Sequence, residues 1–275
     1  INARLSQRSI ESWQKRPALA GFLFGVFDLI LTQNDAMARA MTTINAPANR
    51  VTPGINLKSM AGPLPQDEET IAEAREALEG RPVWIASSTH PGEEKAVLEA
   101  HRQLLERIPE LCLILVPRHP ERGDEVAGLI ASYGLTHGRR TRGDMPREQV
   151  YLADTLGELG TWYALSDIVF LGGSLHPIGG HNPYEVAQAG AMVLSGTHVA
   201  NFAETYAEME AAGAARLVAG TQDLADRVGD LLRNDIARAS GVAAAKAYAA
   251  GQTDKLDSIA ERLITALHLR GDSDA

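Results

Sequence analysis

The chain has 275 residues, 45% of them hydrophobic and 22% charged, which is typical of a globular protein with one large or two modest domains. Its net charge of −9 argues against a general attraction to nucleic acid. Cys112 is the single cysteine, which excludes a disulfide framework and favours a reducing compartment. No apolar run reaches the roughly 20 residues that a membrane-spanning helix needs.

The charge is divided unevenly along the chain. Residues 1–60 contain seven Lys or Arg and three Asp or Glu, a net charge of +4, whereas the remainder contains 19 and 32, a net charge of −13. Such asymmetry is common where two domains meet different partners. The chain opens with the strand-like "INARLS" and without Met, so we expect further sequence upstream of Ile1.

Residues 1–60 have the pattern of the C-terminal part of an α/β domain. Residues 27–33 are predicted to form a strand, 35–44 a helix and 49–54 a second strand. The apolar segment 22–32, "FLFGVFDLILT", contains Asp28 and is predicted to be a buried passage from helix to strand rather than a membrane contact. The segment 61–69, "AGPLPQDEE", is rich in Pro, Gly and acidic residues and is predicted to be a linker.

Residues 70–275 are predicted to form a complete second α/β domain. Strands are expected at 83–87, 111–117, 150–154, 167–173, 191–196 and 215–218, and helices at 93–107, 121–133, 183–189 and 201–212. Short apolar runs that alternate with amphipathic helices indicate a parallel sheet covered on both faces. The tail from about 221 to 269 has no strand pattern and is expected to form three helices.

Ligands of open parallel sheets bind beyond the carboxyl ends of the strands. After the first strand of the second domain comes "SSTHPGEE" (87–94), in which Ser88 or Thr89 could cap the next helix. The free N–H groups at the start of that helix would suit a phosphate. Ordinary helix capping explains the same residues equally well.

An arginine follows the second strand of this domain. Arg118 lies between Pro117 and Pro120, which limits where its side chain can reach. A planar guanidinium can bind one phosphate through two charge-assisted hydrogen bonds. We therefore predict a phosphate contact, with a surface ion pair to Glu121 as the alternative.

The loops after the third and fourth strands are rich in glycine. Gly157 and Glu158 fall where a helix begins, although Glu158 could merely complement the helix dipole. In "GGSLHPIGGHNPYEVAQAG" (172–190), Asn182, Pro183 and Glu185 resemble a capping box.

Capping does not explain the glycines upstream, which we predict let the backbone approach a ligand; they are Gly172, Gly173, Gly179 and Gly180. Glu185 is predicted to accept hydrogen bonds from the hydroxyls of a ribose. The basic segment 137–147, "HGRRTRGDMPR", is predicted to be a solvated loop away from the site, with contact to anionic lipid as the alternative.

Together these motifs resemble the bacterial transferases of 3-deoxy-D-manno-octulosonic acid (Kdo). The resemblance rests on "INARLS", "FDLILTQ", "SSTHPGEE", "PRHPER", "DTLGELGTWYALSDIVFLGGSL" and "GGHNPYEVAQAGAMVLSGTHVANF", in the order of the family. It implies a GT-B glycosyltransferase of two Rossmann-like domains, of which this chain holds the complete C-terminal domain and the end of the N-terminal one. It also implies inverting transfer of Kdo from CMP-Kdo to a lipid A precursor in lipopolysaccharide synthesis.

The resemblance further implies a place for each candidate residue. Pro117 and Arg118 would meet the CMP phosphate, and Gly157, Glu158 and Leu159 would line the cytidine pocket. Gly180, Asn182, Pro183, Tyr184 and Glu185 would hold the ribose and phosphate side, and Ser88 and His90 would face the cleft between the domains. The enzyme would act at the cytoplasmic face of the bacterial inner membrane, with peripheral membrane contact mainly through the N-terminal domain.

Two departures from the family accompany this expectation. Pro91 stands where the family usually has Glu. The family's catalytic base, a glutamate, would lie upstream of Ile1, so no catalytic residue is predicted in this chain. A single phosphate could be balanced by one arginine and helix dipoles, so neither a metal nor a cofactor is expected. Two alternatives remain: a GT-B enzyme that uses a nucleoside-diphosphate sugar, and a nucleotide-binding module without turnover.

Overall fold

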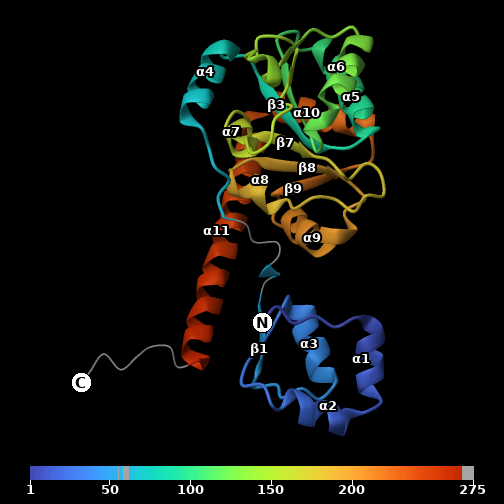
Figure 1. Cartoon of the computed structure of the whole chain (residues 1–275), viewed down its shortest axis with the longest axis vertical. Helices are drawn as coiled ribbons and strands as arrows, with labels where there is room; N and C mark the ends of the chain where they lie inside the picture. The colour runs from blue at the N-terminus through green and yellow to red at the C-terminus, as the bar shows by residue number, and fades with distance from the viewer. Residues whose placement is uncertain (55, 58–61, 268–275) are drawn as a thin grey trace, which may run out of the picture. The chain divides into compact units, whose positions relative to one another are not determined.

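A computed structural model describes residues 1–54, 56–57 and 62–267 of the chain (Figure 1). It divides into two compact units: unit 1 comprises Ile1–Met60 and Ala250–Ala275, and unit 2 comprises Ala61–Ala249. Residue 61 of the predicted linker and residues 268–275 of the predicted tail lie outside the described residues.

Unit 2 is built on a seven-stranded parallel sheet in the order β5-β6-β4-β3-β7-β8-β9 (Figure 1). The strands are β3 (Val83–Thr89), β4 (Cys112–Pro117), β5 (His137–Arg139), β6 (Val150–Leu152), β7 (Ile168–Leu171), β8 (Met192–Gly196) and β9 (Ala215–Val218). The chain builds outward from β3 through β4 and then returns to the other side of β3 with β7. The strand order therefore reverses between β3 and β7, which is where open α/β sheets bind ligands.

Helices cover both faces of this sheet. Alternate apolar side chains of the strands, such as Trp84, Leu113 and Phe170, form one core with α5 (Glu93–Leu105), α6 (Gly123–Ser132) and α10 (Thr221–Arg233). On the other face the Ser87 hydroxyl lies 2.8 Å from that of Tyr163 in α7 (Leu159–Tyr163). Unit 2 also contains α4 (Glu68–Leu78), α8 (Tyr184–Gln188), α9 (Ala203–Ala211) and the first part of α11 (Asp235–Ala266).

Unit 1 contains α1 (Gln7–Gln14), α2 (Pro17–Phe24), β1 (Ile30–Thr32), α3 (Asp35–Thr43) and β2 (Val51–Pro53). Strands β1 and β2 pair in parallel, and "INARLS" adds only one isolated bridge, between Ala3 and Thr32. The side-chain oxygens of Ser6 and Asn34 cap α1 and α3. Leu31 packs against Ile259, which belongs to α11 (Asp235–Ala266).

The tail forms two helices over its described residues, α10 and α11, where we predicted three. The 32 residues of α11 continue through Gly241 and Gly251, each of which costs only about 1 kcal/mol relative to Ala. Its residues from Ala250 onward group with unit 1, whereas the predicted donor domain extended to residue 275. Four further elements, α1, α2, α4 and β5, were not predicted.

The predicted burial of segment 22–32 is wrong for its first half. Ile30, Leu31 and Thr32 are buried in β1, but the side chains of Phe22 and Phe27 are 75% and 50% exposed. Helix α2 is apolar on all its sides. The residues that pack against it cover only part of its surface, so apolar side chains remain exposed. Within the part of the chain that the structure describes, no helix is both long and apolar enough to cross a membrane.

Candidate functional site

The predicted site residues of unit 2 follow the carboxyl ends of four strands. Ser88 is in β3, Pro117 ends β4, Gly157 to Leu159 lie between β6 and α7, and Gly180 to Glu185 lie between β7 and α8. These strand ends share one edge of the sheet, on both sides of the point where the strand order reverses.

A buried carboxylate joins the loops after β3 and β7. Glu93, which is fully buried, accepts hydrogen bonds from the backbone N–H groups of His90 (3.0 Å) and Gly173 (2.7 Å) on Oε2. Its Oε1 accepts from the N–H groups of Ser174 and Leu175, both at 2.8 Å. We expected the amides of this glycine turn to be free for a ligand, and that expectation is wrong because Glu93 already occupies them.

This arrangement could not be predicted from the local sequence. An acid in the first turn of a helix is ordinarily read as complementing the helix dipole. The partners of Glu93 in the turn lie about 80 residues away in the chain. Gly172 is required there for a different reason than predicted: a Cβ at this position would lie 2.6 Å from the carbonyl oxygen of Ser88.

Three histidines lie beside this buried carboxylate. The Nε2 atoms of His90 and His181 are 2.9 Å apart, so one ring donates a hydrogen bond to the other, and the ring of His119 meets that of His90 edge-on. Burial lowers the pKa of His181 to about 4, and the charges of His90 and Arg118 act in the same direction. Burial also lowers the pKa of His90, against the opposing charge of Glu93. Both shifts favour the neutral form of the two rings.

Ser88 lies at the end of β3 with an unusual backbone. Its φ of 53° is in the left-handed region, and the β3–β4 register shifts between Ser87 and Thr89. A non-glycine residue in this region costs about 1–2 kcal/mol.

Arg118 and Glu185 carry opposite charges that no described residue neutralises. The side chain of Arg118 is exposed just beyond β4, while its backbone N–H donates to the Thr89 carbonyl at 2.9 Å. Glu185 is half-buried, and burial raises the pKa of its carboxyl group, opposed by the positive charge of Arg118. Within the described residues neither side chain forms a hydrogen bond or ion pair, so both are available to a ligand.

The predicted capping box before α8 does not form. Pro183 is the N-cap residue, and the Asn182 side chain accepts a hydrogen bond from the Tyr184 N–H at 3.2 Å, but Glu185 does not return a hydrogen bond to residue 182. The Tyr184 ring is buried and its hydroxyl donates to the Ala249 carbonyl, so this side chain serves packing.

Gly180 also serves packing. Its N–H donates to the Gly173 carbonyl at 2.8 Å, and its φ is 78°. A Cβ at this position would lie 3.0 Å from the Cα of Val199. The lack of a side chain at Gly180 therefore lets its backbone lie close to the loop after β8.

The basic segment 137–147 is only partly the solvated loop that we predicted: residues 141–144 and 147 are exposed, but its start is not a loop. It contains β5, the edge strand beside β6, which places its arginines at the same edge as the candidate site. Arg140 forms an ion pair with Glu158 (2.7 Å) and lies over the Trp162 ring. Arg139 forms ion pairs with Asp124 and with Asp154. Burial raises the pKa of Asp154, but hydrogen bonds from Arg139 and Thr141 lower that pKa by more. Glu158 is thus held in place beside Gly157, whose φ is 84°.

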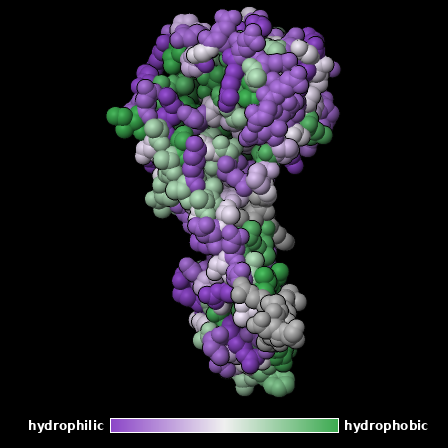
Figure 2. Space-filling view, turned by 90° about the vertical axis from the view of Figure 1, so that its left-hand side faces the viewer, coloured by the Kyte–Doolittle hydropathy of each residue, from purple (hydrophilic) through white to green (hydrophobic). Residues whose placement is uncertain are grey.

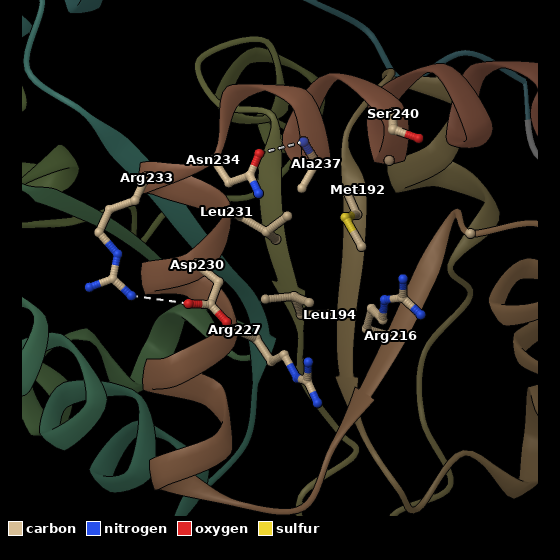
Figure 3. Close-up of a pocket in the computed structure, with 12 residues that line it drawn as sticks. Met192, Leu194, Arg216, Arg227, Asp230, Leu231, Arg233, Asn234, Ala237 and Ser240 are labelled. Atoms are coloured by element: carbon tan, nitrogen blue, oxygen red, sulfur yellow. Dashed lines mark hydrogen bonds and ion pairs between the residues drawn. The ribbon is translucent and has the colours of Figure 1, made fainter.

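A separate cavity of about 530 Å³ lies near the start of β8 and the junction of α10 and α11 (Figure 3). Its floor includes Met192 and Leu194, and the side chains of Arg216 and Arg227 flank Leu194. None of the predicted site residues lines this cavity. Over the described residues, no group of three or more His, Cys, Asp or Glu side chains is arranged to hold a metal ion.

Comparison with known proteins places these features in context. Residues 1–61 match the family model of 3-deoxy-D-manno-octulosonic-acid transferase (kdotransferase). The 3-deoxy-D-manno-octulosonic acid transferase of Haemophilus influenzae is 36% identical over 243 residues, which cover 85% of this chain and 55% of that protein. The chain thus spans about half the length of such relatives.

Solved structures also resemble the chain, and two of them are informative. The C-terminal CMP-Kdo binding domain of WaaA from Acinetobacter baumannii is 36% identical, with a TM-score of 0.60, and the match covers 65% of this chain and 97% of that domain. HepE of Anabaena in complex with UDP is 16% identical, with a TM-score of 0.52, over 92% of this chain and 68% of that one. The second likeness concerns the fold alone, and the two together confirm the predicted α/β, GT-B fold class.

Proposed function

This chain belongs to the Kdo transferase family, and we propose that it binds CMP-Kdo and serves in the transfer of Kdo to a lipid A precursor in lipopolysaccharide synthesis. The observation that carries the proposal is the 36% identity to a CMP-Kdo binding domain, 97% of which the chain covers. The match of residues 1–61 to the family model supports it from the other end of the chain.

The unpaired charges of unit 2 suit a nucleoside monophosphate. The guanidinium of Arg118 would bind the single phosphate, because its planar fork makes two charge-assisted hydrogen bonds to such a group. The carboxylate of Glu185 would accept hydrogen bonds from the ribose hydroxyls. Gly157, Glu158 and Leu159 would border the cytosine, and Ser88, His90 and Asn182 would border the remainder of the donor. One guanidinium balances most of the charge of one phosphate, so in this proposal the inverting transfer needs no metal.

Unit 1 carries an apolar surface that we assign to peripheral membrane contact. Five large hydrophobic side chains of α2 and the following turn are exposed, and Figure 2 shows hydrophobic surface at the end of unit 1 that carries α2; they are Leu19, Phe22, Leu23, Val26 and Phe27. Lys15 and Arg16 precede α2 and are exposed. Apolar side chains beside basic ones favour an anionic lipid surface, which would be the cytoplasmic face of the bacterial inner membrane.

Calorimetric titration of the chain with CMP and UMP tests the nucleotide assignment. We expect CMP to bind more tightly than UMP, and Arg118→Ala to weaken CMP binding at least tenfold. Arg107→Ala, which removes an exposed arginine just beyond the C-terminal end of α5, should leave CMP binding unchanged. Equal binding of CMP and UMP, or an Arg118→Ala variant with unchanged affinity, would contradict the proposal.

A further inference from the structure

The turn after β7 is an anion-binding site that the protein fills with its own carboxylate. Three consecutive backbone N–H groups, from Gly173 to Leu175, converge on Glu93 together with the N–H of His90, at 2.7 to 3.0 Å. Gly173 has a φ of 68°, which lets consecutive amides point to one side. Concavities of this kind bind phosphate groups in other proteins.

Occupation by Glu93 has a consequence for any nucleotide at this edge. A phosphate would need the same N–H groups, and it would meet a buried carboxylate of like charge. Glu93 has no solvent-exposed surface, and its four hydrogen bonds hold it in place. The turn is therefore closed to a ligand phosphate.

The nearby guanidinium groups are committed in the same way. Arg122 is paired with Glu94 and Glu125. Arg139 and Arg140 are paired with the acids described above. Arg118, in the same segment after β4 as Arg122, forms no ion pair with a described residue. Of these four arginines, Arg118 alone is left unpaired, enough for one phosphate, and the amides of the 173–175 turn are not free for a second.

From this we infer that Glu93 is a specificity-determining residue, which fills the anion site of the 173–175 turn and so excludes nucleoside diphosphates and the sugars linked to them. The inference rests on the proposed function, because it concerns how the same edge chooses its nucleotide. It explains why a carboxylate is buried between two loops that otherwise face a ligand.

A purely structural clamp would behave differently. If Glu93 only joined the two loops, its loss would weaken the binding of CMP and CDP by the same factor. If it excludes the second phosphate, its loss should favour CDP relative to CMP. The ratio of the two dissociation constants therefore separates the two roles, because both nucleotides carry the same base and ribose.

The experiment is a calorimetric titration of the full chain and three variants with CMP and with CDP. We expect the wild type to bind CDP no more tightly than CMP. Glu93→Ser, which vacates the turn, should shift the ratio at least tenfold toward CDP, and Glu93→Gln, which keeps the shape without the charge, should shift it less. Glu99→Gln is the control, since it removes a carboxylate of the same helix that pairs with Arg102 and does not touch the turn; its ratio should stay within twofold of the wild type.

A second measurement does not depend on nucleotide binding. Inorganic phosphate at millimolar concentration should raise the thermal unfolding temperature of Glu93→Ser, with little effect on the wild type, because the vacated amides can bind it. An unchanged CDP-to-CMP ratio in Glu93→Ser together with no phosphate effect would overturn the inference. If neither Glu93 variant folds, the wild type decides: tenfold tighter binding of CDP than of CMP overturns it, and weaker binding supports it. Failure of the wild type to bind CMP would instead overturn the proposed function, while the phosphate effect would still test the turn.

Discussion

Replacement of Glu185 should separate the stability of the protein from its affinity for a nucleotide. The carboxylate is half-buried, it has no hydrogen-bonding partner among the described residues, and burial raises its pKa. A buried charge without a partner destabilises the fold, so Glu185→Ala and Glu185→Gln should not lower the free energy of unfolding of the ligand-free protein. The same variants should bind CMP weakly.

The size of the loss follows from the hydrogen bonds that Glu185 would accept. Hydrogen bonds to charged groups contribute about 1.5–3 kcal/mol each, and the lower end applies to a carboxylate that is partly exposed to water. Two such bonds from a ribose contribute about 3 kcal/mol, which corresponds to about a 100-fold weaker affinity of Glu185→Ala for CMP. Removal of one hydroxyl, as in 2′-deoxy-CMP, should cost the wild type about tenfold.

A double-mutant cycle between protein and ligand provides the assay. Titration calorimetry should show that 2′-deoxy-CMP and CMP bind Glu185→Ala within about twofold of each other, because the partner of the missing hydroxyl is gone. Glu148→Ala, which removes an exposed glutamate, should retain the wild-type preference. A Glu185→Ala variant that still prefers CMP tenfold would refute the ribose assignment. A loss of more than about 2 kcal/mol in the free energy of unfolding would show that the carboxylate supports the fold instead.

The pH dependence of stability gives the same test without a ligand. A carboxyl group whose pKa is raised by folding contributes stability that is fully present below its ordinary pKa and is lost as the pH rises through the raised value. Urea unfolding of the wild type should show this loss at mildly acidic pH, and Glu185→Gln should lack it. Identical pH profiles for the two proteins would contradict the direction of the shift.

Three further predictions concern other parts of the chain. Burial lowers the pKa of His101 from 6.5 to about 4, so its contribution to the free energy of unfolding, about 3 kcal/mol, should be lost as the pH falls from 6.5 to 4. Urea titrations should show a loss about 3 kcal/mol smaller in His101→Gln than in the wild type. Arg140→Ala should release Glu158 and weaken CMP binding about threefold to tenfold, whereas Arg142→Ala, at an exposed arginine two residues away, should not. Phe22→Ser should lower binding to vesicles of anionic phospholipid about tenfold in a sedimentation assay, with no change in CMP affinity, and equal vesicle binding would contradict the membrane assignment.

The strands of unit 2 could be predicted because they are buried on both faces. Runs such as "LCLILVP" and "AMVLSG" are continuous and apolar, and each became a strand within a few residues of its expected bounds. Strand β5, "HGR", could not be found this way, since it is a short edge strand made of two polar residues and a glycine. Its omission left Arg139 and Arg140 in an apparent loop, although the strand brings them to the candidate site.

The candidate site could be predicted only where a residue acts by its position after a strand. The place of Arg118 could be predicted from the end of β4 and the residues beside it alone. The role of Glu93 depends on the reversal of strand order between β3 and β7, which brings amides from a distant turn to the start of α5. Local sequence favours a capping box around Asn182 and Glu185, and the structure differs because α8 begins one residue later, after Pro183.

The charges at this edge fall into two groups with different consequences. Glu93 and the arginines at 122, 139 and 140 are each bound to protein partners, so they fix the loops before any ligand arrives. Arg118 and Glu185 have no such partners among the described residues, and Ser88 beside them has a strained backbone. These positions make the ligand-free protein less stable than it could be. A ligand whose phosphate pairs with Arg118 and whose hydroxyl groups bind Glu185 can recover that stability. Ligand binding should therefore raise the unfolding temperature by more in the wild type than in any variant at residue 118 or 185, even though those variants are at least as stable when empty.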